Sequence, residues 1–191
     1  MRADGTVIAD LTAELEKLHA ASFGWAMSCC RRDQTAAEEV LQTVYLKIIE
    51  GTARFRGEAS FQTWLFAVIR KTAISEHRRS RLWQLRDVAL RSSSNQSRTG
   101  VETPDAVFEK SEAQVRFQKA LRTLPTRQRE ALHLVFYEDL SLSEAAFVMG
   151  ISIGSARQHY ERGKRRLRQV IEQTESDYGI HWRRKENPGA I

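Results

Sequence analysis

The segment from residue 141 to residue 168 holds the side chains whose types and spacing best suit binding to an anion. Ser141 and Glu144 have the spacing of a capping box at the start of a helix. Gly150 tolerates the left-handed backbone of a tight turn, and Ser152 can cap the helix that follows. Two short helices joined in this way form a helix-turn-helix, which places its second helix in the DNA major groove. The outward side of that second helix is polar and mainly basic, with Arg157, Gln158, His159, Glu161, Arg162, Lys164, Arg165 and Arg168.

An ordinary helical hairpin with a solvated basic face is the alternative interpretation of this segment, because basic faces often serve only solubility. The combination of the cap, the glycine turn and the dense arginines favours DNA. The charge is unevenly distributed: residues 70–91 hold seven basic and two acidic residues, and residues 117–170 hold ten and five, a net of +5 each. Residues 10–50 carry four basic and seven acidic residues, a net of −3, so this part of the chain should avoid polyanions.

A further amphipathic helix is expected between Asp33, a good N-cap, and Gly51. Its core stripe consists of Ala37, Val40, Leu41, Val44, Tyr45 and Ile48. Its opposite face carries Glu39, Gln42, Leu46 and Ile49. Two of these four are apolar although the core stripe is already complete, which favours a docking surface over scattered surface leucine. An earlier amphipathic stretch begins near Leu11 and is expected to run to about Cys30.

A loop and a third helix follow, and both suit contact with a nucleic-acid strand. The loop at residues 55–60 has aromatic, cationic and anionic side chains that could hold an unstacked base. The helix is expected from Phe61 to Arg81, with Trp64 on its apolar stripe and therefore in the core. Its cations are expected to contact phosphates, which fixes position without reading sequence. These cations are Arg70, Lys71, Arg78, Arg79 and Arg81.

Periodicity and composition predict an all-α protein of two small helical domains joined by a flexible linker. The stretch from residue 91 to residue 104 is almost free of apolar side chains, so it cannot bury enough surface to offset its ordering entropy. The expected segments are a first domain at 1–90, a linker at 91–111, a helix-turn-helix domain at 112–173 and a C-terminal tail at 174–191.

Several motifs in both domains resemble those of the extracytoplasmic-function (ECF) sigma factors of the sigma-70 family. In chain order they are AEEVLQTVYLK at 37–47, FRGE at 55–58, FQTWL at 61–65, Arg78-Arg79 and LPTRQR at 124–129. The first four are similar to the second conserved region of that family, which includes its promoter-melting part. The last, together with the helix-turn-helix, is similar to the fourth region. The resemblance covers roughly residues 8–82 and 112–170, in the correct order and spacing.

The resemblance implies an RNA polymerase sigma factor, which directs core polymerase to specific promoters and helps to open the −10 element. The implied partners are the clamp helices of the largest polymerase subunit, the flap of the second-largest subunit, and promoter DNA. A membrane-anchored or soluble anti-sigma factor is expected to hold the protein inactive by covering both domains.

The same resemblance assigns residues to three surfaces. Core polymerase binding is expected at Glu38, Glu39, Gln42, Leu46 and Ile49. Binding to the −10 element is expected at Phe55, Arg56, Glu58, Ala59, Lys71, Ser75, Arg78 and Arg79. Binding to the −35 element is expected at Ser155, Arg157, Gln158, His159, Glu161, Arg162 and Arg165. Lys71 and Ser75 depart from the family pattern, which prefers Asn at the first position and Asp or Asn at the second, so a different −10 preference is expected.

No pattern in the sequence indicates an enzyme, a cofactor or a metal site. A glycine-rich phosphate loop, a His-Glu-x-x-His pattern and a nucleophile elbow are all missing, and the five histidines are scattered. The adjacent Cys29 and Cys30 are expected to be reduced thiols. A signal peptide and a membrane span are also missing, so we expect a cytoplasmic protein with no membrane insertion of its own. A stand-alone helix-turn-helix regulator remains the alternative, although it would leave the motifs at 55–79 unexplained.

Overall fold

The computed structural model describes the backbone of residues 5–90 and 120–178, and every regular element within those ranges is an α-helix. The helices are α1 (Gly5–Lys17), α2 (His19–Cys29), α3 (Gln34–Ile49), α4 (Phe61–Leu90), α6 (Thr126–Phe136), α7 (Leu142–Met149) and α8 (Ile153–Tyr178). The predicted all-α class is confirmed. The predicted linker lies outside the described residues, as does most of the predicted tail, although α8 continues through Tyr178.

Local capping explains where α3 and α4 begin and where α3 ends. The stretch predicted as one helix is divided at Leu18 into α1 and α2. Asp33 caps α3 as predicted, because its carboxylate accepts a hydrogen bond from the N–H of Ala36 at 3.0 Å. Gly51 then ends that helix region in the left-handed conformation, with φ of 72°. Ser60 caps α4 by accepting a hydrogen bond from the N–H of Thr63 at 3.1 Å. That helix continues to Leu90, well past its expected end at Arg81.

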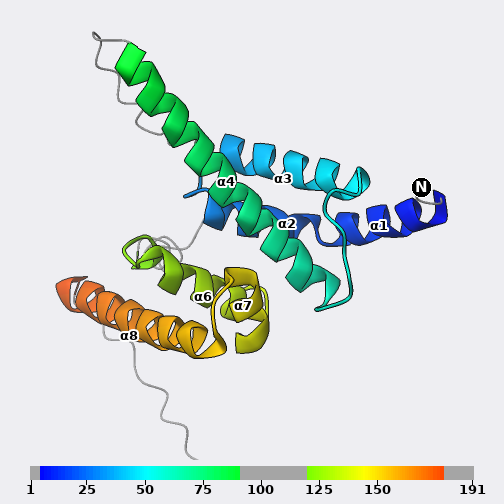
Figure 1. Ribbon diagram of the computed structural model, residues 1–191. Helices are drawn as coiled ribbons and strands as arrows, with labels where there is room; N and C mark the ends of the chain where they lie inside the picture. The colour runs from blue at the N-terminus through cyan, green and yellow to red at the C-terminus, as the bar shows by residue number, and fades with distance from the viewer. Residues whose placement is uncertain (1–4, 91–119, 179–191) are drawn as a thin grey trace, which may run out of the picture.

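The N-terminal core forms where α2, α3 and α4 pack against one another (Figure 1). Its largest fully buried side chains are Trp25 of α2 and Phe66 of α4. The indole N–H of Trp25 donates a hydrogen bond to the carbonyl oxygen of Phe66 at 3.0 Å, so its one polar group is satisfied inside the core. Cys29 and Cys30, at the end of α2, are free thiols, and burial raises the pKa of both.

The C-terminal half confirms the predicted helix-turn-helix. Ser141 and Glu144 form the capping box of α7, and Gly150 ends that helix with φ of 62°. Ser152 then accepts a hydrogen bond from the N–H of Ser155 at the start of α8. Helices α6 and α8 come close at Gly163, because a Cβ there would lie 3.1 Å from a methyl carbon of Leu132. No larger residue fits this crossing without displacing its neighbours.

The two halves pack directly on each other, with α4 against α7 and α2 against α6 (Figure 1). A single apolar cluster includes Trp25 and Leu65 from the first half and Leu134, Val148 and Met149 from the second. The rings of Trp25 and His133 lie with their centroids 5.3 Å apart across this boundary. Within the described residues no helix is long and apolar enough to cross a membrane.

Candidate nucleic-acid interface

The outward face of α3 is exposed as the sequence predicts. Val40 and Val44 are buried on the opposite side, whereas Leu46 and Ile49 are 57% and 58% exposed. The remaining members of the predicted stripe, Glu38, Glu39 and Gln42, are exposed as well. An apolar pair surrounded by acidic and amide groups on a stable helix is suited to docking on another protein rather than to binding DNA.

The loop before α4 builds an aromatic cluster at the start of that helix. Phe55 contacts both Phe61 and Trp64, with ring centroids 5.5 Å apart in each pair. Phe61 and Trp64 complete the cluster at 5.4 Å. Gly57 lets the loop turn back with φ of 74°. Because Phe55 is still 41% exposed, its ring offers a surface for stacking.

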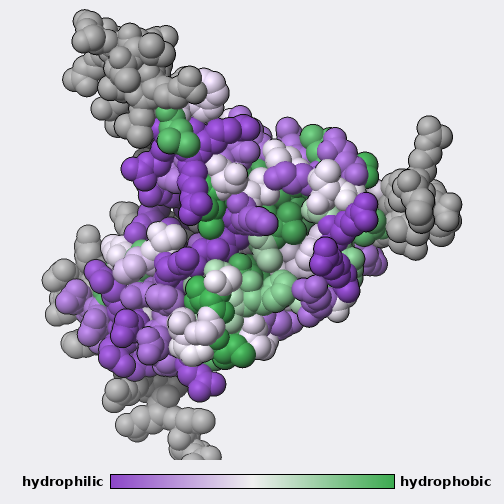
Figure 2. Space-filling model, viewed as in Figure 1, coloured by the Kyte–Doolittle hydropathy of each residue, from purple (hydrophilic) through white to green (hydrophobic). Residues whose placement is uncertain are grey.

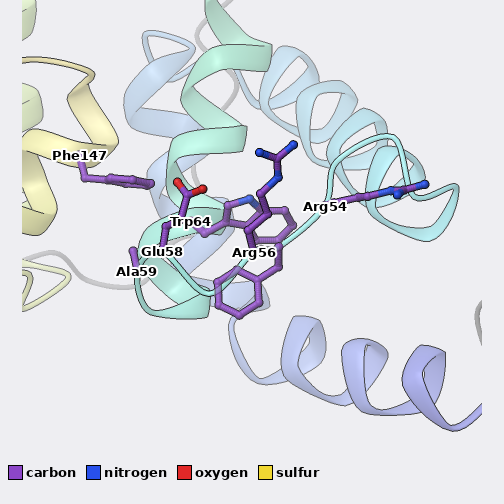
Figure 3. Close-up of a pocket in the computed structure, with 7 residues that line it drawn as sticks. Arg54, Arg56, Glu58, Ala59, Trp64 and Phe147 are labelled. Atoms are coloured by element: carbon purple, nitrogen blue, oxygen red, sulfur yellow. The ribbon is translucent and has the colours of Figure 1, made fainter.

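This loop forms one wall of a pocket of about 260 Å³ (Figure 3). Its lining residues are Arg54, Phe55, Arg56, Glu58, Ala59, Trp64 and Phe147. The pocket combines aromatic surface with two exposed arginines and an exposed carboxylate, and these are the groups that hold an unstacked base by stacking and edge hydrogen bonds. Trp64, predicted as a core residue, lines the pocket while packing on the core, so it does both.

One wall of the pocket comes from the other half of the molecule. Phe147 belongs to α7, and its side chain points from that helix toward Glu58 and Trp64 (Figure 3). Apolar side chains also gather where α7 approaches the first turns of α4 (Figure 2). Phe147 could not be assigned to a surface from the sequence, since a lone apolar residue on an exposed helix face carries no signal of its own.

The face of α4 beyond the pocket presents polar and cationic side chains. Lys71, Ser75, Arg78 and Arg79 are all exposed, and their spacing puts them along one side of the helix. Arg79 is held by Glu76, with an N–O distance of 2.8 Å. These residues can approach a DNA strand that runs along α4.

The expectation that Arg70 contacts phosphate is wrong. Arg70 is only 8% exposed, and its guanidinium makes two 3.2 Å hydrogen bonds to the carboxylate of Glu130 in α6. The reason lies in the packing of the two halves, which buries this position of α4 between them. Periodicity along α4 could not reveal a partner that lies sixty positions further along the chain.

Helix α8 displays the third predicted surface, and hydrophilic side chains cover it in Figure 2. Arg157, Gln158, Arg162 and Arg165 are exposed, as is Glu161, whereas Ser155 and His159 are half-buried. Glu161 is paired with Lys164 at 3.0 Å. Ser155 accepts a hydrogen bond from the hydroxyl of Ser152 at 2.9 Å. The exposed arginines and glutamine are therefore the side chains of α8 most available to a DNA groove.

Comparison with protein families agrees with this geometry in both halves. The model described as "Sigma-70 region 2" matches residues 15–82, and the model described as "Sigma-70, region 4" matches residues 114–167. Together they cover more than half of the chain. The chain belongs to the sigma-70 family. A sigma-70 factor supplies RNA polymerase with promoter specificity and is not an enzyme. A stand-alone helix-turn-helix regulator is not favoured, because region 2 precedes the helix-turn-helix.

Curated relatives place this sigma-70 factor in the ECF group. RNA polymerase sigma factor SigZ of Bacillus subtilis is 27% identical over 73% of this chain and 75% of its own length. ECF RNA polymerase sigma factor EcfG of Rhodopseudomonas palustris is 25% identical over 71% of both chains. Among solved structures, the sigma factor RpoE of Bartonella quintana in complex with the anti-sigma factor NepR has a TM-score of 0.67 at 25% identity. That match covers 85% of this chain and 97% of RpoE.

A second solved structure, CnrH in complex with the cytosolic domain of CnrY, shares the fold at a TM-score of 0.56 and 19% identity. It covers 85% of this sigma factor and 87% of CnrH.

Proposed function

We propose that each of the three surfaces described above has a separate binding role in this ECF sigma factor. The outward stripe of α3 docks on the clamp helices of the largest subunit of core polymerase, and the fourth region meets the flap of the second-largest subunit. The loop at 55–60 and the exposed face of α4 bind the −10 element, and α8 binds the −35 element. The protein acts in the cytoplasm, where its polymerase partner is.

The observation that best supports this proposal is the pocket beside α4. Duplex recognition needs only a helix in a groove, whereas initiation also needs bases captured outside the stack. The aromatic ring of Phe55 and the carboxylate of Glu58 line one pocket at the start of the helix that carries Lys71. This arrangement supports capture of the non-template strand next to a cationic helix face.

We further propose that an anti-sigma factor controls the protein. The supporting observation is that RpoE, at 25% identity, was solved in complex with the anti-sigma factor NepR. We expect this regulator to be either a soluble or a membrane-anchored protein.

The proposed opening step is tested by Phe55→Ala combined with Glu58→Ala. Because unstacking costs a few kcal/mol that capture must offset, the variant should lose most open-complex formation on duplex promoters. It should keep its affinity for core polymerase and for the −35 element. Permanganate footprinting and run-off transcription measure these effects.

A template with a pre-melted −10 bubble removes part of the opening cost and should restore some transcription by the variant. Glu50→Ala is the matched control, since Glu50 is exposed close to the loop but does not line the pocket. Normal duplex opening by the double variant would contradict the assignment of the loop.

A further inference from the structure

A line of side chains runs along one side of α4, from the pocket toward the C-terminal end of the helix. At about 100° per residue, positions 64 and 82 are separated by five full turns, so Trp64 and Leu82 lie on the same line. Lys71, Ser75 and Arg78 lie between them, within about 40° of that line. The pocket and Leu82 are therefore at the two ends of one face of α4.

Leu82 is the apolar end of this otherwise polar line. Its side chain is 62% exposed, and exposed arginines precede it at Arg78, Arg79 and Arg81. The last turns of α4 project past α3, so this end of the helix is open to a large partner (Figure 1). A single exposed leucine is common on protein surfaces, but this one continues the line that carries Lys71 and Ser75.

The distribution of charge along α4 indicates which form of DNA each end fits. Residues 61–69, beside the pocket, include no charged side chain, whereas residues 78–81 include three arginines. Duplex DNA carries one phosphate charge per about 1.7 Å of its axis, and a single strand carries one per about 3.4 Å. The arginine-rich end therefore suits the duplex, and the uncharged end with its aromatic pocket suits an unstacked base.

The length of the line sets the spacing between these two contacts. Trp64 and Leu82 are about 27 Å apart along the helix axis at 1.5 Å per residue. At 3.4 Å per base pair this is about eight positions of DNA. Base edges in the major groove are polar except for the C5-methyl group of thymine. An exposed leucine that faces this groove can therefore gain binding energy chiefly from a thymine.

We propose that Leu82 reads the C5-methyl group of a thymine in the duplex between the −10 and −35 elements. This thymine lies about eight positions from the base that the pocket holds. The flanking arginines bind phosphates and fix the register, and Leu82 adds sequence preference to it. The inference rests on the proposed function of this face of α4 as the −10 surface.

Replacing thymine by uracil tests this contact, because it removes the methyl group and keeps the base pair and the charge. The probe is a promoter duplex that the polymerase holoenzyme selects from a random pool, with each thymine between the two elements changed to uracil in turn. Wild-type holoenzyme should bind one of these duplexes about fourfold more weakly, the factor that corresponds to about 0.8 kcal/mol for one buried methylene-sized group. Holoenzyme with Leu82→Ala should bind the thymine and uracil forms of that duplex equally.

Two further variants serve as controls. His77→Ala changes an exposed residue that lies about 140° around α4 from Leu82, so it should keep the wild-type response to uracil. Leu82→Met keeps an apolar side chain of similar size and should keep most of that response. Circular dichroism should show unchanged helix content in all three variants, since both positions are exposed.

Two results would overturn the proposal. One is a Leu82→Ala holoenzyme that responds to uracil as strongly as the wild type, because another group would then read the methyl. The other is a wild-type holoenzyme that responds to no uracil substitution. If Leu82→Ala then also weakens binding to core polymerase, Leu82 contacts protein and not DNA.

Lys71→Ala separates this inference from the proposed function on which it rests. Lys71 lies on the same line but contacts no methyl group in the proposal, so its loss should weaken promoter binding with thymine and uracil alike. If Lys71→Ala weakens binding while no uracil substitution has an effect, the −10 surface stands and the role of Leu82 is wrong. If neither change alters the affinity, the proposed function of this face of α4 fails as well.

Discussion

Arg157 lies in the second turn of α8 and is exposed, where a long cationic donor can reach a base edge in the major groove. A specific base contact contributes about 1–3 kcal/mol of discrimination, whereas a phosphate contact weakens binding to all sequences alike. We expect Arg157→Ala in the polymerase holoenzyme to reduce discrimination among −35 variants by an amount in this range. Competition binding across a set of −35 sequences measures it.

Arg168→Ala is the control for Arg157→Ala, since Arg168 is exposed three turns further along α8. It should weaken binding uniformly and leave discrimination as it is. Unchanged discrimination in Arg157→Ala would show that Arg157 only neutralises phosphate.

The apolar pair on α3 gives a second prediction for individual residues. Gln42 and Leu46 are exposed on the side opposite the buried Val40 and Val44, so the fold does not depend on them. Gln42→Ala with Leu46→Glu should weaken binding to core polymerase at least tenfold while leaving helicity and the melting temperature nearly unchanged. Surface plasmon resonance with core polymerase and circular dichroism give the two readouts; a variant that unfolds would show that the stripe is structural.

Side-chain exposure could be predicted from the sequence where one helix alone determines it. The alternation of Val44 and Leu46 between core and surface follows from helical periodicity, and the structure agrees. Arg70 shows the limit of this reasoning. Its environment depends on Glu130 in the other half of the molecule, and no local sequence pattern predicts that pairing. Phe147 was missed for the same reason, because its neighbours in the pocket belong to the distant loop.

Among the helices, the capping box of α7 gives the clearest prediction. The hydroxyl and the N–H of Ser141 both donate to the carboxylate of Glu144 and hold the pKa of that group below its ordinary value. Ser141→Ala should lower the free energy of unfolding by about 1 kcal/mol at neutral pH. A lowered pKa contributes stability that is present above the ordinary carboxyl pKa and is lost as the pH falls through the lowered one.

The effect of Ser141→Ala should therefore shrink in acid, once Glu144 is protonated in both proteins. Denaturant unfolding at neutral and at acid pH measures the difference. Ser80→Ala, at an exposed position of α4, is the control and should have almost no effect at either pH. An effect of the Ser141 substitution that does not change with pH would contradict the role of the carboxylate.

Helix ends that depend on neighbouring residues were predictable, and those that depend on tertiary contacts were not. Asp33, Ser141 and Gly150 act on the backbone within a few positions, so their sequence pattern identified the caps of α3 and α7. The break at Leu18 and the extension of α4 to Leu90 have no such signal. Residues 82–90 are compatible with a helix, and no glycine or proline among them marks where it ends.

For the molecule as a whole, the shared apolar cluster predicts cooperative unfolding. Buried residues of α2 and α4 contact those of α6 and α7, so neither half keeps its full core alone. Differential scanning calorimetry of the wild type should show one transition. Removing one partner of a buried ion pair costs about 3–5 kcal/mol, so Glu130→Arg should lower the temperature of this transition. Two transitions in the wild type would show that the halves unfold independently.

The contact between α4 and α7 also affects how tightly other molecules bind. Because one chain carries both surfaces, the chain itself fixes the effective concentration of one half at the other, and dilution does not weaken their contact. A ligand that requires this contact to be broken has its apparent dissociation constant divided by the fraction of molecules in which it is broken, so a fraction of about 1% weakens binding about 100-fold.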